Sequence, residues 1–123
     1  MKQKIVLEYQ IKSSPKLLYN RLSTPAGLSE WFANDVNLKG NIFSFIWEGS
    51  EQKAEVTNKK ENKYVRFRWI DDPETFFEFR VAVDELTQEV ALIVTDFVDE
   101  DDKDGAIELW NSQVSELKHI IGL

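Results

Sequence analysis

The feature that most constrains this chain is the regular alternation of apolar and polar side chains through its middle. The clearest case is YVRFRWI at residues 64–70, where Val65, Phe67 and Trp69 occupy every second position. Successive side chains of a β-strand point to opposite faces of a sheet, so a period of two predicts a strand with one apolar face. A sheet built from such strands needs a second layer to cover that face.

Five further segments are predicted to be strands. Residues 41–47 place Phe43, Phe45 and Trp47 on one face, whereas residues 90–98, VALIVTDFV, are apolar on both faces, as a strand covered on both sides is. The remaining strands are predicted at 5–11, 51–60 and 75–83, with turns at 60–63, 71–74 and 84–89. Consecutive strands joined by short turns predict an antiparallel meander.

Two short helices are predicted between the first strand and the meander. Each begins with a hydroxyl residue followed by proline, at Ser14-Pro15 and at Thr24-Pro25. Ser or Thr at the N-cap and proline at the first helical position are common at helix starts. The apolar residues of the two helices are Leu17, Leu18 and Leu22 in the first, and Leu28, Trp31 and Phe32 in the second.

The last segment is predicted to be one long helix that packs against the sheet. Lys118 and His119 lie near its end, where positive charge is favourable beside the helix dipole, and Gly122 is expected to terminate it. Its apolar residues recur at intervals of three and four and so form one stripe. They are Ile107, Trp110, Val114, Leu117 and Ile121.

Composition and charge exclude several classes of function. The chain has 123 residues, 42% of them hydrophobic, and lacks the run of about 18 apolar residues that a membrane-spanning helix needs. Its start, MKQKIVLEYQ, has no secretion-signal pattern, and it has no cysteines for disulfides or zinc. The formal charge of −7 disfavours nucleic acid and anionic membranes as partners. We therefore expect one cytoplasmic domain over residues 1–123, without metal or cofactor.

The order of these elements resembles the helix-grip architecture of the START-like (SRPBCC) superfamily, which birch-pollen-type allergens and bacterial polyketide cyclases share. The pattern T-P-x-x-L-x-x-W, followed by a second aromatic residue, is similar to the branch that contains the activator of the 90-kDa heat-shock chaperone ATPase. Trp110 and the tail VSELKHIIG fit the final helix of that branch. The residues that match the pattern are Thr24, Pro25, Leu28, Trp31 and Phe32.

The resemblance covers nearly the whole chain and implies an α+β fold. In that fold a curved antiparallel sheet wraps around the long C-terminal helix, and two short helices follow the first strand. The resemblance also implies a cavity between the sheet and the long helix, closed at one end by the short helices. Because Trp31 and Phe32 are adjacent, we expect one to anchor its helix in the core and the other to lie at the rim of the cavity.

The leading hypothesis for function is that this cavity binds a small hydrophobic molecule, either a lipid or an aromatic compound. Ligand sites are concave and mainly apolar, with a few polar groups that orient the ligand. Plain core packing is the alternative for each aromatic residue, since burial of a large apolar side chain is itself stabilising. The candidate lining residues are Trp31, Phe45, Trp47, Phe67, Trp69, Phe79 and Trp110.

Two other functions remain open from the sequence. One is a protein-interaction module, similar to a co-chaperone, that contacts a chaperone or another partner through the outer face of the sheet. Arg66, Arg68 and Arg80 are expected on that face, and cross-strand ion pairs involving Glu78 are the default expectation for them. The other is a cyclase-type enzyme or hydrolase that acts on an aromatic or polyketide-like substrate.

The residues available for acid–base chemistry are few, which favours a binding domain over an enzyme. They are Tyr64, Asp96 and His119. His119 is expected in solvent near the helix end. Asp96 is either a pocket carboxylate with a raised pKa or, as we expect, a residue near a strand end in water, because burial of a lone charge is costly. The acidic run 99–104 lacks the spacing of a calcium loop and is expected to be solvated.

Overall fold

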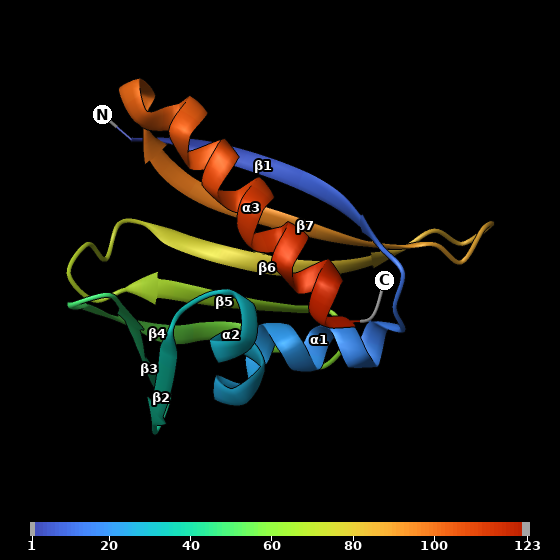
Figure 1. The fold of residues 1–123 in the computed structure, drawn as a ribbon, viewed down its shortest axis with the longest axis horizontal. Helices are drawn as coiled ribbons and strands as arrows, with labels where there is room; N and C mark the ends of the chain where they lie inside the picture. The colour runs from blue at the N-terminus through green and yellow to red at the C-terminus, as the bar shows by residue number, and fades with distance from the viewer. Residues whose placement is uncertain (1, 122–123) are drawn as a thin grey trace.

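The computed structural model describes residues 2–121, which form a layer of seven antiparallel strands and a layer of helices (Figure 1). The strand order is β1-β7-β6-β5-β4-β3-β2. The strands are β1 (Lys2–Ile11), β2 (Asp35–Lys39), β3 (Ile42–Trp47), β4 (Ser50–Lys60), β5 (Tyr64–Trp69), β6 (Phe76–Val83) and β7 (Val90–Asp99). The helices are α1 (Pro15–Ser23), α2 (Pro25–Trp31), the 3₁₀ turn η1 (Glu100–Asp102) and α3 (Lys103–Ile121). The α+β architecture predicted from the sequence is confirmed.

The alternating segments form the strands that their period predicts. In β5, Val65 and Phe67 are buried on the inner face, and Phe67 pairs directly with Phe77 of β6. Strand β7 pairs with both β1 and β6, so its continuous apolar run lies inside the sheet. The sequence did not predict β2, although Val36 and Leu38 alternate with polar residues in DVNLK, because two apolar side chains in five residues make only a short pattern. Of the five residues, only Val36 is buried.

Both short helices begin at the predicted caps. The Ser14 hydroxyl accepts a hydrogen bond from the Leu17 amide at 3.1 Å, and the Thr24 hydroxyl accepts one from the Gly27 amide at 3.0 Å. Thr24 is at once the last cap of α1 and the first cap of α2. The two helices are therefore joined by a single residue, which fixes the angle between them.

Helix α3 crosses the same face of the sheet that α1 and α2 occupy (Figure 1). Its stripe buries Trp110, Val114 and Leu117 against the sheet, as predicted. The Tyr9 hydroxyl of β1 donates a hydrogen bond to the Asn111 side chain at 2.7 Å, which ties the helix to the edge strand. Gly122, the predicted terminator, lies outside the described residues.

The core between the two layers is built from aromatic rings. Phe67 and Phe77 stack with ring centroids 4.7 Å apart, and Phe45 packs edge-on against Phe67 at 5.9 Å. Phe32, which follows α2, stacks on Trp110 of α3 at 5.7 Å and packs edge-on against Phe45 at 5.1 Å. Phe32 thus connects both helices to the sheet.

The outer face of the sheet carries the predicted cross-strand ion pairs. Arg66 donates to one carboxylate oxygen of Glu78 from two nitrogens, at 3.1 and 3.0 Å, and Arg80 lies 3.5 Å from the other oxygen. Arg68 pairs with Glu55 at 3.4 Å. The Arg66 guanidinium also lies over the Phe76 ring at 4.0 Å. The arginines on this face are therefore already paired within the chain.

Candidate functional site

A hollow opens between the first half of α3 and the inner face of the sheet, which we call the tryptophan hollow. Its volume is about 350 Å³. Strands β3, β4, β5 and β7 form one wall, and α3 together with the residue after α2 forms the other. The residues that line it are Phe32, Trp47, Gln52, Trp69, Asp96, Ala106, Leu109, Trp110 and Gln113.

Hydrogen bonds to one backbone carbonyl hold two sides of this hollow together. The Phe32 carbonyl oxygen accepts a bond from the Trp47 indole at 2.8 Å and another from the Gln113 side chain at 3.0 Å. The end of α2, the end of β3 and the middle of α3 are joined at this atom. The Trp47 ring is thereby fixed in place before any ligand arrives, which lowers the entropic cost of binding.

Asp96 is the one residue with a formal charge among the nine described wall residues. One of its carboxylate oxygens accepts a hydrogen bond from the Trp110 indole at 2.9 Å, and the other accepts one from the Phe97 amide at 2.8 Å. Burial raises the pKa of Asp96, an effect that these two hydrogen bonds and the charge of Lys2 oppose. The expectation that Asp96 lies in water near a strand end was therefore wrong, because Trp110 and α3 cover it.

The structure brings three of the seven candidate lining residues to the hollow. Trp47 and Trp69 are half-buried and line it together with Trp110. The other four, Trp31, Phe45, Phe67 and Phe79, belong to the buried core behind it. That any of the seven binds a ligand stays a prediction.

The adjacent aromatic residues Trp31 and Phe32 are both buried in the core, each 5% exposed, so neither lies at an open rim. Trp31 anchors α2 in the core, and its indole donates a hydrogen bond to the Arg21 carbonyl at 2.9 Å. Phe32 lies in the wall of the hollow. The sequence predicted Trp31 as a lining residue, whereas the structure places its neighbour Phe32 in the wall of the hollow.

Sequence reasoning did not single out Leu109, Ala106, Gln113 or Gln52. Leu109 is a large apolar residue outside the stripe of α3 and is 60% exposed, but single apolar residues are common on protein surfaces and are no signal by themselves. The two glutamines carried no signal either, since only the fold brings them to the hollow.

The three candidates for acid–base chemistry do not come together. Asp96 faces the hollow, but Tyr64 lies on the outer face, where the Arg80 guanidinium covers its ring at 4.5 Å. His119 is exposed near the end of α3. The geometry therefore gives no catalytic arrangement of these three residues.

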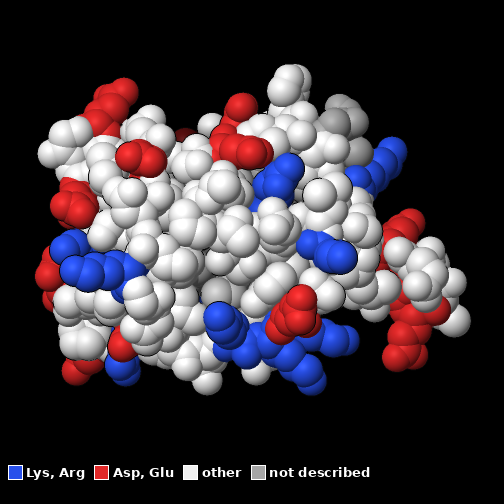
Figure 2. All heavy atoms as spheres, turned by 90° about the horizontal axis from the view of Figure 1, so that it is seen from below, with Lys and Arg blue, Asp and Glu red and all other residues white. Residues whose placement is uncertain are grey.

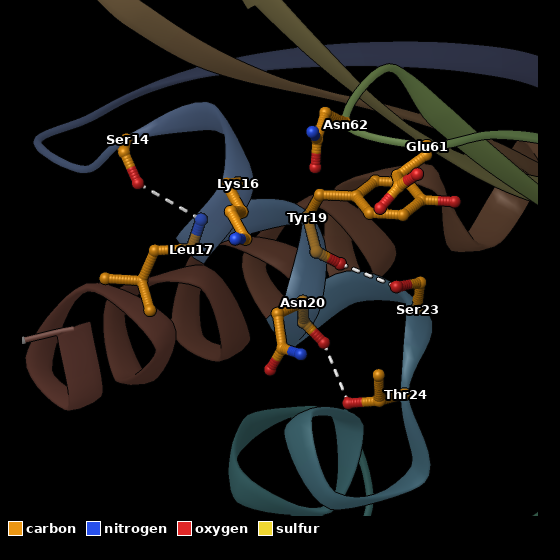
Figure 3. A pocket seen from close by; sticks show the side chains of 9 residues that line it. All are labelled: Ser14, Lys16, Leu17, Tyr19, Asn20, Ser23, Thr24, Glu61 and Asn62. Carbon is orange, nitrogen blue, oxygen red and sulfur yellow. Dashed lines mark hydrogen bonds between the residues drawn. The ribbon is translucent and has the colours of Figure 1, made fainter.

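Two further hollows flank Tyr19. Figure 3 shows the one between α1 and the turn that joins β4 to β5. Their volumes are about 480 and 660 Å³. Two of the hydroxyl groups in their walls serve the helices: Ser23 donates to the Tyr19 carbonyl at 2.8 Å and Thr24 to the Asn20 carbonyl at 2.8 Å. We favour the smaller tryptophan hollow, because its wall combines half-buried indole rings with the half-buried carboxylate of Asp96.

Charge is unevenly spread over the surface. Figure 2 shows the molecule from below, with acidic side chains at both ends and several Lys and Arg side chains across its lower middle. Within residues 2–121 no group of three or more His, Cys, Asp and Glu residues is arranged to hold a metal ion, and no helix there is both long and apolar enough to cross a membrane.

Comparison with known proteins places this arrangement in a family. A model of the START-like superfamily domain matches residues 1–123. The chain belongs to the START-like superfamily. Members of this family share the sheet and long helix described above, so the resemblance seen in the sequence is confirmed. No curated protein matches the sequence.

Solved structures similar to this START-like domain cover almost all of it. The solution structure of BfR322 from Bacteroides fragilis is 36% identical, with a TM-score of 0.69 over 99% of this chain and 93% of that one. The structure described as the Aha1 dimer from Colwellia psychrerythraea is 23% identical, with a TM-score of 0.83 over 98% and 97%. MLL2253 from Mesorhizobium loti is 20% identical, with a TM-score of 0.80 over 97% and 96%. The last two likenesses support the fold alone.

Proposed function

We propose that this START-like domain binds a small hydrophobic molecule in the tryptophan hollow. The observation that carries the proposal is the open apolar wall of the hollow, to which Trp47 and Trp69 contribute half-buried rings beside the buried Trp110. Aromatic side chains supply a large contact area with few rotatable bonds, so they bind apolar ligands at low entropic cost. The wall is also held by hydrogen bonds through Phe32 and Asp96.

The size of the hollow favours an aromatic compound over a whole lipid. Its volume of about 350 Å³ lies near the lower limit of roughly 300–1,000 Å³ for sites that bind drug-sized molecules. A molecule of one or two rings fits such a space, whereas a two-chain lipid exceeds it. The flat indole faces are suited to stacking on a ring of this kind.

A variant that fills the hollow tests the proposal. Ala106 lies in the wall on α3 and is half-buried, so Ala106→Phe places a ring where the ligand is expected. The neutral fluorophore N-phenyl-1-naphthylamine is titrated into the wild type and the variant. We expect saturable enhancement of its fluorescence with the wild type, and a loss of affinity of about tenfold or more in the variant.

A matched control separates a filled site from a damaged fold. Ser112 lies on the exposed side of the same helix, so Ser112→Phe adds the same ring away from the hollow and should bind the probe like the wild type. Thermal unfolding followed by circular dichroism shows whether both variants are folded. Equal binding by the wild type and a folded Ala106→Phe protein would contradict the proposal.

A second candidate function is a protein-interaction module that acts on a 90-kDa heat-shock chaperone through the outer face of the sheet. The observation in its favour is the similarity of fold to the Colwellia structure described as Aha1. Arg68 is the suitable residue to change, because its half-exposed side chain makes one ion pair of 3.4 Å. Arg66 is less suitable, since its two hydrogen bonds hold the buried Glu78 in place.

The test of this second candidate is the ATPase rate of a purified 90-kDa chaperone with and without the START-like domain. We expect the domain to raise the rate and Arg68→Glu to remove the increase. Lys12→Glu, an exposed reversal on the segment between β1 and α1, is the control and should keep it. A rate that the wild-type domain leaves unchanged would exclude this function with that chaperone.

A further inference from the structure

We propose that the ligand of the tryptophan hollow is an organic cation: an amine or quaternary ammonium group attached to an apolar body. This inference rests on the proposed function, because it names the class of molecule that the same hollow takes. Two independent properties of the wall point to it, the placement of one carboxylate and the enrichment in indole rings.

The first property is that the carboxylate of Asp96 still has acceptor capacity. An ionised carboxylate has roughly four lone-pair positions, and Asp96 uses one on each oxygen, toward the Trp110 indole and the Phe97 amide. The nearby basic residue Lys2 is engaged at 3.4 Å with Asp72. A cation in the hollow would therefore meet a charged acceptor that the chain has only partly satisfied.

The second property is the nature of the remaining wall. Three of the nine residues are tryptophans, and Phe32 adds a fourth ring. The negative faces of aromatic rings attract ammonium groups, with Trp the strongest, and aromatic cages bind quaternary ammonium ligands in this way. The same rings accommodate the apolar body of the ligand, so one site serves both parts of the molecule.

The wall disfavours the opposite charge. The polar side chains other than Asp96 in the described wall are the amides of Gln52 and Gln113, and the Gln113 amide nitrogen already donates to the Phe32 carbonyl. An anionic ligand would have to approach the half-buried carboxylate of Asp96 without a cationic partner, which is costly because like charges repel more strongly away from bulk water. A cation relieves the same unfavourable burial.

The surroundings of the hollow favour the approach of a cation. An adjoining hollow shares Gln52 and Trp69 with it, and the charged residues in that second wall are Glu51, Asp71, Asp72, Lys2 and Lys53. Three carboxylates against two lysines leave this approach negative, in a chain whose formal charge is −7. The net negative charge at this approach, together with that of the whole chain, favours the encounter with a cation over that with an anion.

The alternative is that Asp96 only anchors α3 by accepting the Trp110 hydrogen bond. The two roles separate when two ligands of the same shape and different charge are compared. Benzyltrimethylammonium and neopentylbenzene differ by the replacement of the central nitrogen with carbon. Binding of each is followed by the indole N–H signals in ¹H–¹⁵N NMR spectra of the isotope-labelled protein.

We expect benzyltrimethylammonium to shift the indole signals of Trp47, Trp69 and Trp110, and to bind about tenfold or more tightly than neopentylbenzene. The Trp31 indole is an internal control, because it donates to the Arg21 carbonyl behind the core. Equal affinities for both molecules would overturn the inference and leave the proposed function standing. If neither molecule shifts the indole signals, the inference is wrong, and so is the proposal that the hollow accepts ligands of this size.

Two pairs of variants sharpen the result. Leu109 lies at the rim and is 60% exposed, so Leu109→Lys and Leu109→Glu change the charge of the mouth with little effect on folding. We expect the lysine variant to bind benzyltrimethylammonium several-fold more weakly than the glutamate variant. The same two changes at Leu86, which is 95% exposed in the turn between β6 and β7, are the control and should bind alike.

Asp96→Asn tests the carboxylate itself. It should lower the affinity for benzyltrimethylammonium to about that for neopentylbenzene, while binding of the neutral molecule is retained. If the variant binds both molecules as the wild type does, Asp96 serves only as an anchor and the inference is wrong. Neopentylbenzene binding by the variant also reports that the hollow has kept its shape.

Discussion

Asp84 and Asp96 show how the surroundings of a single residue decide its electrostatic role. The exposed Asp84 accepts hydrogen bonds from the amides of Thr87 and Leu86, at 3.1 and 2.8 Å, and these lower its pKa. At Asp96 burial is the larger effect and raises the pKa, although two hydrogen bonds and the charge of Lys2 oppose it. One residue type thus gives opposite shifts.

The first prediction concerns Asp96→Asn. Because the pKa of Asp96 is raised in the folded state, the native protein holds this proton more tightly than the unfolded chain does. The stabilising contribution of protonated Asp96 is therefore fully present below the unfolded pKa, about 3.9, and is lost as pH rises through the pKa of the folded state. The free energy of unfolding of Asp96→Asn minus that of wild type should therefore increase as pH rises from about 3 to about 7. Urea unfolding at several pH values measures this difference.

Asp84→Asn is the matched control for this prediction and should behave in the opposite sense. The pKa of Asp84 is lowered, so its contribution to stability is present above the unfolded value and is lost as pH falls through the folded value. The free energy of unfolding of Asp84→Asn minus that of wild type should therefore decrease as pH rises. Two parallel stability profiles would contradict the assigned direction of at least one of the two shifts.

At the scale of an element, the junction of α1 and α2 depends on close backbone approach. A Cβ added at Gly27 would lie 2.6 Å from the Arg21 Cα atom and 2.6 Å from the Asn20 carbonyl oxygen. Both atoms are backbone, so neither can move without shifting α1. The shared cap Thr24 stands at the same place and bonds both helices. Glycine here allows two helices to meet after a single linking residue.

The second prediction is that Gly27→Ala destabilises the protein. Alanine is the better helix former by about 1 kcal/mol, but the clash should outweigh this gain and leave a net loss of roughly 1–3 kcal/mol. Guanidinium unfolding followed by circular dichroism measures the change. Gly105→Ala is the control, because a Cβ at Gly105 in α3 meets nothing within 4 Å; it should leave stability unchanged or raise it. A Gly27→Ala protein as stable as wild type would show that the junction has room to relax.

At the scale of the whole molecule, Phe32 joins the layers. Its ring lies 5.1 Å from Phe45 and 5.3 Å from Phe77 in the sheet, and 5.7 Å from Trp110 in α3. Its carbonyl accepts the bonds from Trp47 and Gln113. Phe32 therefore connects two strands of the sheet, the end of α2 and the long helix through its ring and its carbonyl, and it also lines the hollow.

The third prediction is that Phe32→Ala costs about 3–5 kcal/mol of unfolding free energy, as expected when a buried ring leaves a cavity. Phe76→Ala removes a half-buried ring of the outer face, which contacts Phe97 at 4.9 Å, and should cost clearly less. Urea unfolding of both variants gives the comparison. Similar losses for both would mean that Phe32 is not a special junction between the layers.

The sequence by itself determined the fold to a large extent, because each element carries its own local signal. Alternation marked β5, the Ser-Pro and Thr-Pro pairs marked the starts of α1 and α2, and the stripe through Trp110, Val114 and Leu117 marked the buried face of α3. The period of a pattern depends on backbone geometry, which is the same in every protein. Strand β2 was not predicted because its alternation is short: only Val36 and Leu38 alternate with polar residues in its five positions.

Only the tertiary structure decided the site. Trp47 and Trp69 alternate with their neighbours just as the buried residues Phe45 and Phe67 do, and Trp110 lies in the same helical stripe as the buried residues Val114 and Leu117. Whether an apolar side chain is covered depends on where α3 ends its contact with the sheet, which is a property of packing between distant segments. Asp96 was misjudged for the same reason: the residue that covers it, Trp110, is 14 positions away and is brought there by the turn into α3.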